Sequence, residues 1–196
     1  SAMPPYLQLR VSLLTAKLIE TPMLSIIIHM TMVATKAAHL CRDADKKPIL
    51  EFGSRRTHIE GAVDAAVAAY IGGVMGTSNV EAHHRYGVPV LGTMDHFAVQ
   101  SWERAGVSVS DTERAFFSAF IKTYPSHASL LVDTYDMFGS DTGIRNAVFA
   151  ARELGVSLDA IRIDSGLSNP TQALSTLTRA RSLLDELGEP QAKIIA

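Results

Sequence analysis

The stretch Val88-Pro-Val-Leu-Gly-Thr-Met-Asp-His96 joins a short apolar run to a Gly-Thr break and a histidine. Such a run predicts a buried strand, and the histidine then lies in the loop that follows it. In α/β barrels, the reacting groups lie at the carboxyl ends of the strands. Imidazole exchanges protons near neutral pH and can accept a phosphoryl group, although a lone histidine is often structural. His96 is therefore a candidate catalytic residue that needs support from the rest of the chain.

Four further apolar runs also end in polar, charged or glycine-rich residues. They lie at residues 49–56, 72–79, 130–136 and 161–166. Together their ends supply guanidinium, carboxylate, hydroxyl and amide groups. Guanidinium pairs with phosphate or carboxylate, and carboxylates bind metal ions or sugar hydroxyls. This set of groups favours an anionic, phosphate-bearing substrate that contains a sugar and brings a metal ion.

From residue 47 onward, short apolar runs alternate with segments of helical periodicity, which is typical of parallel strands with right-handed crossovers. Helices are expected at residues 59–70, 80–86, 111–124, 142–154 and 171–187. There are about six strand candidates, whereas a closed barrel of this kind needs about eight. We therefore predict an α/β fold in which residues 47–196 form an incomplete parallel (β/α) barrel. The chain is accordingly expected to be a fragment of a larger barrel enzyme.

Residues 1–46 are expected to form an N-terminal helical segment, with a helix that opens at Pro22. Residues 24–33 are apolar but short, with His29 among them and Lys36 soon after. A buried amphipathic helix is therefore favoured over a membrane span. The start of the chain also lacks the positive region, apolar core and cleavage site of a signal peptide.

Glycine and aspartate are expected at the ends of the later helices. Gly87, Gly155 and Gly188 stand where the end of a helix favours a left-handed residue. Asp111 and Asp141 are expected to be N-caps, because a carboxylate can accept from the free amides of the first turn.

The composition restricts the class of protein. The 196 residues are 47% hydrophobic and 19% charged, as in soluble globular chains. A net charge of −2 argues against a general nucleic-acid or membrane surface. The single cysteine, Cys41, excludes an internal disulfide and fits a reducing cytosol, so we expect a cytoplasmic protein.

Five short motifs follow one another in a fixed order along the chain. They are Phe-Gly-x-Arg-Arg at 52–56, Gly-Thr-Ser-Asn-Val at 76–80, Gly-Thr-Met-x-His at 92–96, Val-Asp-Thr-Tyr-Asp at 132–136 and Arg-x-Asp-Ser-Gly at 162–166. In this order they resemble the nicotinate phosphoribosyltransferase family of type II phosphoribosyltransferases. The likeness runs from about residue 16 to the last residue.

The resemblance implies a reaction. Nicotinate attacks the anomeric carbon of phosphoribosyl pyrophosphate and gives nicotinate mononucleotide and pyrophosphate, a step of NAD biosynthesis and salvage. The family couples turnover to ATP hydrolysis through a phosphorylated histidine and uses Mg²⁺, and its members are homodimers with shared active sites. Nicotinate and phosphoribosyl pyrophosphate are thus the expected partners, with neither nucleic acid nor membrane among them.

The same resemblance assigns roles to individual residues. His96 matches the phosphorylated histidine, and Asp164 matches the carboxylate near the ribose; these two are the candidate catalytic residues. Arg162 matches the cation near the leaving group and the ring. Asp133, at the end of a predicted strand, is a candidate for binding magnesium or ribose hydroxyls. No residue is assigned as a resident metal ligand.

The pyridine ring is assigned to residues of the first two motifs. Arg55 matches the arginine that faces the nicotinate carboxylate, and Phe52 the aromatic residue that stacks on the ring. Ser78 stands where nicotinamide-using relatives have an aspartate, so a neutral hydroxyl would tolerate a carboxylate. Arg56 is a further candidate for substrate binding and equally fits a surface ion pair. Phe52 also fits a core position, and Ser78 an ordinary turn before a helix.

Two departures from the family pattern leave alternatives open. Leu167 follows the Asp-Ser-Gly motif where an acidic residue is frequent, and Asp95 precedes His96 where many relatives have a small residue. Asp95 either tunes His96 or points away from it. The alternatives are a transferase for nicotinamide or quinolinate, or a truncated barrel that binds a ligand without turnover.

Overall fold

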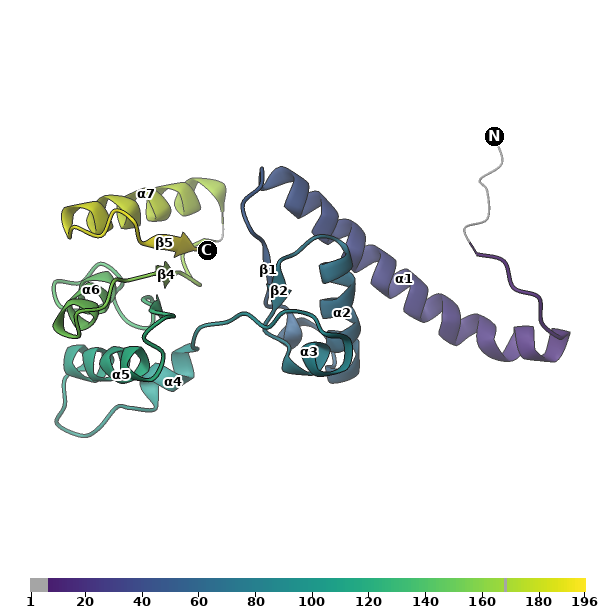
Figure 1. Cartoon of the computed structure of the whole chain (residues 1–196), viewed down its shortest axis with the longest axis horizontal. Helices are drawn as coiled ribbons and strands as arrows, with labels where there is room; N and C mark the ends of the chain where they lie inside the picture. The colour runs from purple at the N-terminus through teal and green to yellow at the C-terminus, as the bar shows by residue number, and fades with distance from the viewer. Residues whose placement is uncertain (1–6, 168) are drawn as a thin grey trace. The chain divides into compact units, whose positions relative to one another are not determined.

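The computed structural model describes residues 7–167 and 169–196, which divide into two compact units between Gly92 and Thr93 (Figure 1). Both units combine helices with short parallel strands, so the α/β class is confirmed. From the sequence, a boundary was instead predicted between residues 46 and 47, where the expected helical segment is followed by alternating strands and helices.

The first unit contains a small parallel sheet with helices around it. Its elements are α1 (Leu13–Asp43), β1 (Leu50–Glu51), the 3₁₀ helix η1 (Ser54–Arg56), α2 (Ile59–Ile71), β2 (Gly76–Thr77) and α3 (Val80–Tyr86). Strand β1 pairs with β2, with Leu50 opposite Gly76. Because α2 connects the two strands, β1, α2 and β2 form a βαβ unit whose loops leave the same edge of the sheet.

The strand expected after α3 is reduced to one bridge between Thr77 and Val90. Pro89 accepts a hydrogen bond from the Thr77 amide at 3.0 Å, and the Leu91 amide donates to the Thr77 carbonyl at 2.9 Å. Since proline has no N–H to donate, regular pairing does not extend along this segment.

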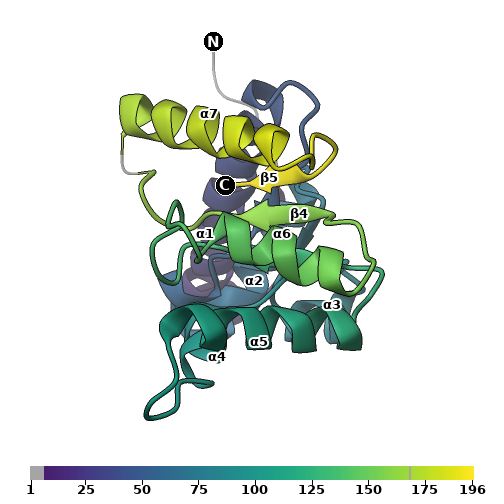
Figure 2. The same cartoon turned by 90° about the vertical axis from the view of Figure 1, so that its left-hand side faces the viewer.

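The second unit has a three-stranded parallel sheet in the order β3-β4-β5. Its elements are α4 (His96–Gln100), α5 (Val109–Thr123), β3 (Ser129–Leu131), α6 (Ile144–Glu153), β4 (Ala160–Arg162), α7 (Pro170–Glu186) and β5 (Lys193–Ile195). Helices α6 and α7 lie on one face of the sheet (Figures 1 and 2). Leu130 and Ile161, which pair across β3 and β4, are fully buried in the core beneath them.

Helix α1 differs from the expectation in two ways. It begins at Leu13, after Ser12, whose hydroxyl accepts from the Thr15 amide, and it continues through Pro22. The start predicted at Pro22 is therefore wrong, because the Ser12 cap, ten residues earlier, satisfies the first turn. The expected burial is also wrong, because Ala37 is the sole buried residue of α1 among those described.

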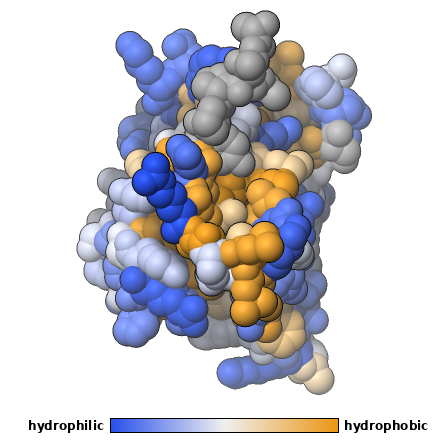
Figure 3. All heavy atoms as spheres, turned by 90° about the vertical axis from the view of Figure 1, so that its right-hand side faces the viewer, coloured by the Kyte–Doolittle hydropathy of each residue, from blue (hydrophilic) through white to orange (hydrophobic). Residues whose placement is uncertain are grey.

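Large apolar side chains remain exposed along α1. Leu13, Leu14 and Leu18 are 79%, 71% and 69% exposed, and Figure 3 shows apolar side chains gathered on the face that it presents. By length and composition alone, α1 is long and apolar enough to cross a membrane, as are some core helices of soluble proteins.

The glycine predictions at helix ends are confirmed, whereas the predicted aspartate caps are wrong. Gly87, Gly155 and Gly188 all have φ between 66° and 73°. Helix α5 is capped by Ser108, whose hydroxyl accepts from the Asp111 amide at 3.0 Å. Helix α6 follows Gly143 without a side-chain cap.

Candidate functional site

In the second unit, the residues that carry chemistry come from three segments: the turn before α4, the end of β3 and the end of β4. His96 is the first residue of α4, and Asp95 is its N-cap, with Oδ1 accepting from the Ala98 amide at 2.7 Å. The Asp95 carboxylate therefore acts as a helix cap. The cap thereby fixes the backbone from which the His96 ring projects.

His96 and Asp133 form a hydrogen-bonded pair. The distance from His96 Nε2 to Asp133 Oδ1 is 3.1 Å, with the imidazole 35% exposed and the carboxylate 2% exposed. The other oxygen, Oδ2, accepts from the Asp164 amide at 2.7 Å and the Ser165 amide at 2.6 Å. Asp133 thus contacts protein groups through both oxygens, and it ties the end of β3 to the loop after β4.

Asp133 remains ionised although it is buried. Burial raises the pKa of its carboxyl, but hydrogen bonds from Ser165, Asp164 and His96 together lower that pKa below its ordinary value of 3.8. A carboxylate can only accept, so the His96 Nε2 atom carries the proton that they share. In the neutral ring, the other nitrogen, Nδ1, then keeps the lone pair that could attack a phosphoryl group or accept a proton.

Arg162 lies at the end of β4 and reaches the turn before His96. Its Nη1 atom donates to Thr93 Oγ1 at 3.0 Å and to the Met94 carbonyl at 2.9 Å, and its side chain is 13% exposed. Its Nη2 atom lies 3.5 Å from Asp164 Oδ2. Asp164 is 49% exposed at its side chain, so its carboxylate is open to a ligand. The structure therefore brings together all four predicted residues of this unit, His96, Asp133, Arg162 and Asp164.

The remaining predicted residues lie in the first unit, on the loops after β1 and β2. Arg55 and Arg56 are exposed on η1, and Ser78 is exposed directly after β2. Phe52 is 37% exposed, so it is not a core residue. The two loops are in contact, because Asn79 Nδ2 donates to Ser54 Oγ at 3.3 Å.

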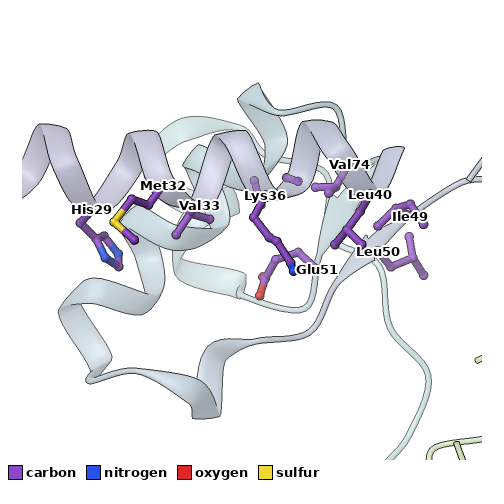
Figure 4. Close-up of a pocket in the computed structure, with 11 residues that line it drawn as sticks. His29, Met32, Val33, Lys36, Leu40, Ile49, Leu50, Glu51 and Val74 are labelled. Atoms are coloured by element: carbon purple, nitrogen blue, oxygen red, sulfur yellow. The ribbon is translucent and has the colours of Figure 1, made fainter. Parts of the chain in front are cut away.

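An apolar cavity of about 530 Å³ lies elsewhere in the first unit, between α1 and β1. Figure 4 shows His29, Lys36 and Glu51 as its polar lining residues among apolar side chains. No predicted site residue lines it, so its size does not mark the candidate site. Among residues 7–167 and 169–196, no group of three or more His, Cys, Asp or Glu side chains is placed to hold a metal ion.

Comparison with known proteins adds independent information. A sequence model of the nicotinate phosphoribosyltransferase (NAPRTase) family matches residues 48–185, which is more than half of the chain. The chain belongs to this family. The match includes all eight residues that the sequence singled out.

Relatives in the nicotinate phosphoribosyltransferase family match nearly the whole chain. A nicotinate phosphoribosyltransferase of Mycobacterium tuberculosis is 43% identical over 192 residues, covering 97% of this chain and 40% of that protein. The Bacillus subtilis enzyme of that name is 39% identical, covering 98% and 36%. The chain thus spans about 40% or less of the length of these curated relatives.

The fold agrees with this assignment. The crystal structure of human nicotinic acid phosphoribosyltransferase has a TM-score of 0.67 to this chain at 28% identity, covering 93% of this chain and 45% of that one. Two residues that support the site were not singled out from the sequence. Thr93 accepts a hydrogen bond from Arg162, and the Ser165 amide donates one to Asp133. Each lies within one of the five motifs, but the motif had pointed only to the neighbouring charged residue or histidine.

Proposed function

We propose that this protein is a nicotinate phosphoribosyltransferase, which joins nicotinate to phosphoribosyl pyrophosphate and releases pyrophosphate. The observation that carries the proposal is the His96–Asp133 pair, 3.1 Å apart, in a chain of this family. The nicotinate nitrogen forms a bond to the anomeric carbon while the bond from that carbon to the pyrophosphate oxygen breaks. Positive charge develops on the sugar and negative charge on the leaving group.

The second unit supplies groups suited to those charges. The exposed carboxylate of Asp164 would stabilise the positive sugar, since a fixed opposite charge acts most strongly where charge develops. The guanidinium of Arg162, 3.5 Å from Asp164, would stabilise the negative charge that develops on the leaving pyrophosphate. Its hydrogen bonds to Thr93 and Met94 also fix the turn before His96. Asp133, predicted to bind substrate, is better suited to orient the His96 ring, because its side chain is 2% exposed.

We assign the use of ATP to His96. With Nε2 hydrogen-bonded to Asp133, the Nδ1 atom would form a bond to the γ-phosphorus of ATP while the bond from that phosphorus to the β-phosphate oxygen breaks and ADP leaves. The modification adds about 1.5 to 2 negative charges beside the site and changes which anions bind there. Mg²⁺ fits this site as an ion carried by the pyrophosphate: Asp164 is the exposed carboxylate that could join it, whereas both Asp133 oxygens are already occupied. Bound there, it would neutralise leaving-group charge.

The first unit supplies the proposed pyridine specificity. The Arg55 guanidinium would pair with the nicotinate carboxylate, with Arg56 as a further cation and Phe52 stacking on the ring. Ser78 brings no charge, so the carboxylate meets no like charge there. The neutral Ser78 favours nicotinate over nicotinamide as substrate.

The finer architecture is part of the same proposal. The parallel strands would belong to a (β/α) barrel of the type II phosphoribosyltransferases, and the protein would act as a cytoplasmic homodimer with shared active sites. Among the described residues, β1, β3 and β5 each pair on one side only, which supports this, because an open parallel edge is ordinarily covered by another segment or chain.

Growth on nicotinate tests the proposal. The gene that encodes this protein would be expressed in bacteria that lack their own nicotinate phosphoribosyltransferase and depend on an external pyridine for NAD. We expect growth on nicotinate, none on nicotinamide when its deamidation is blocked, and none with His96→Ala. Growth on quinolinate or nicotinamide instead would replace nicotinate as the substrate, and no growth on any of the three would reject the activity.

A further inference from the structure

Glu51 joins the two loops that carry the proposed pyridine-binding residues. It is the last residue of β1, and its Oε1 atom accepts from the Gly53 amide at the start of the loop that leads to Arg55. Its Oε2 atom accepts from Thr77 Oγ1 at 2.5 Å, at the end of β2 and directly before Ser78. One carboxylate thus holds two segments that lie 26 residues apart in the sequence.

Three more hydrogen bonds continue the same connection. The Ser78 amide donates to the Glu51 carbonyl at 3.0 Å. Thr77 Oγ1 accepts from the Asn79 amide at 2.9 Å, and Asn79 Nδ2 donates to Ser54 Oγ at 3.3 Å. The residues on either side of Ser78 are therefore tied to the loop before Arg55.

Burial makes these bonds costly to lose. Thr77 is fully buried, and its hydroxyl donates to Glu51 while it accepts from Asn79. A buried polar group that loses its partner costs about 1–3 kcal/mol, whereas an exposed one is satisfied by water. Glu51 is half-buried beside the apolar cavity, where Figure 4 shows Lys36 of α1 pointing toward the same carboxylate.

The network does more than start helix α3. Asn79 caps that helix by accepting from the Ala82 amide at 3.0 Å, and this bond involves neither Glu51 nor Thr77. The Glu51–Thr77 bond is therefore not part of the α3 cap. It connects the loop after β1 to the loop after β2. Recognition groups must stay within about 0.5 Å of their productive geometry, which a pair of separate loops does not ensure.

We propose that Glu51 and Thr77 are positioning residues that hold Arg55 and Ser78 at a fixed separation and so select a pyridine carboxylate. This inference rests on the proposed function for the identity of the ligand. Neither residue need contact the substrate, because both Glu51 oxygens and the Thr77 hydroxyl are occupied by protein groups. Loss of the bond should weaken nicotinate binding specifically, without slowing the chemical step.

Two substitutions at Thr77 form a matched pair for the test. Thr77→Val keeps the shape and removes the hydroxyl, and Thr77→Ser keeps the hydroxyl. Glu51→Gln is the second variant, in which a single side-chain oxygen remains, so it cannot accept from both the Gly53 N–H and the Thr77 hydroxyl as the two Glu51 oxygens do. Amide hydrogen exchange of the whole chain would be followed at residues 53–57, with residues 129–132 of the other unit as an internal reference.

We expect Thr77→Val and Glu51→Gln to speed exchange at residues 53–57 by about tenfold, with Thr77→Ser close to wild type. The KM for nicotinate should rise about tenfold, while kcat and the KM for phosphoribosyl pyrophosphate stay within about twofold. A tenfold change is what the loss of about 1.4 kcal/mol produces.

Three results would overturn the inference. Unchanged exchange at residues 53–57 in both folded variants would show that the bonds do not hold the β1 loop. Faster exchange with an unchanged KM for nicotinate, or an equal rise in both KM values, would show that the bonds serve stability alone. If wild type forms no nicotinate mononucleotide, the proposed function fails and the assignment to pyridine selection fails with it. The exchange measurement then still decides whether the loops are coupled.

Discussion

At the scale of single residues, the His96–Asp133 pair shows what a sequence can and cannot specify. The Gly-Thr break before His96 and the acidic end of the run at 130–136 each marked a candidate residue. Their contact could not be predicted, because the two residues are 37 positions apart and meet only through the fold. The side chain of Asp133 is 2% exposed, which is why we propose that it orients the His96 ring and does not bind the substrate directly.

A phosphorylation assay tests the role of this pair. Incubation with ATP and Mg²⁺ should give an acid-labile, alkali-stable phosphate on wild type and none on His96→Ala. Asp133→Asn keeps an oxygen for the Asp164 and Ser165 amides but places an amide opposite the ring, so phosphorylation should slow by about 100-fold. Phosphorus NMR should place the group on Nδ1. Label that survives in His96→Ala would contradict the assignment.

The specificity argument predicts different effects for two ligands. Ser78→Asp should raise the KM for nicotinate at least tenfold, because two like charges about 4 Å apart repel by roughly 1 kcal/mol even in water and by more in a less polar site. Binding of uncharged nicotinamide, measured by calorimetric titration, should weaken far less. Ser78→Asn, similar in size but neutral, is the control. Equal effects of Ser78→Asp on both ligands would reject the argument.

At the scale of elements, local signals fixed most helices correctly. Helix α3 was predicted at residues 80–86 and is found there, between the Asn79 cap and Gly87 with φ of 70°. Two errors have identifiable causes. Pro22 suggested a helix start, yet Ser12 caps the first turn of α1. The run at residues 88–91 suggested a strand, but Pro89 cannot donate to a neighbour.

The contact between α5 and α6 depends on a buried acid that the sequence did not indicate. Glu113 is fully buried, and its Oε2 atom accepts from the Gly143 amide at 2.7 Å and Asn146 Nδ2 at 3.0 Å. Burial raises the pKa of Glu113 above its ordinary 4.5, although these hydrogen bonds lower it in part. The folded state therefore binds this proton more tightly than the unfolded state does.

That shift predicts how stability depends on pH. The contribution of Glu113 to the free energy of unfolding should be most favourable below pH 4.5 and should fall as the pH rises through its raised pKa. Glu113→Gln should abolish this part of the dependence, so its Tm should gain on wild type as the pH increases. Thermal unfolding across pH 4 to 8 would measure the gain, with exposed Glu186→Gln as a control that follows wild type. A constant difference between Glu113→Gln and wild type would contradict the assignment.

At the scale of the whole molecule, exposed apolar surface predicts association of the 196-residue chain. Leu14 and Leu18 of α1 are 71% and 69% exposed, and surface of this kind ordinarily marks an interface. Light scattering should show self-association that Leu14→Glu/Leu18→Glu reduces. Thr21→Glu/Ser25→Glu adds the same charge at exposed polar positions and should leave association unchanged. A monodisperse monomeric wild type would reject this prediction.

The order of motifs along the chain predicted more than any single residue could. Each of the five motifs lies at or directly after a strand end or bridge in the structure. The parallel topology therefore places their polar side chains at the carboxyl ends of the strands. The supporting contacts were missed because Thr93, Ser165 and Glu51 act through other residues. Residues of these types are common in any sequence, so their role is recognised only from the contacts that they make in the folded chain.

Formation of nicotinate mononucleotide by the purified protein tests the central claim most directly. Labelled nicotinate would be supplied with phosphoribosyl pyrophosphate, ATP and Mg²⁺, and the product followed by chromatography and mass. The protein would be expressed from its whole gene. The account predicts that it forms one nicotinate mononucleotide and one pyrophosphate for each nicotinate consumed. It predicts that Asp164→Asn, which removes the exposed carboxylate proposed to face the ribose, lowers kcat by at least about 100-fold. Product formed at the wild-type rate by Asp164→Asn, or no product from folded wild type, would contradict it.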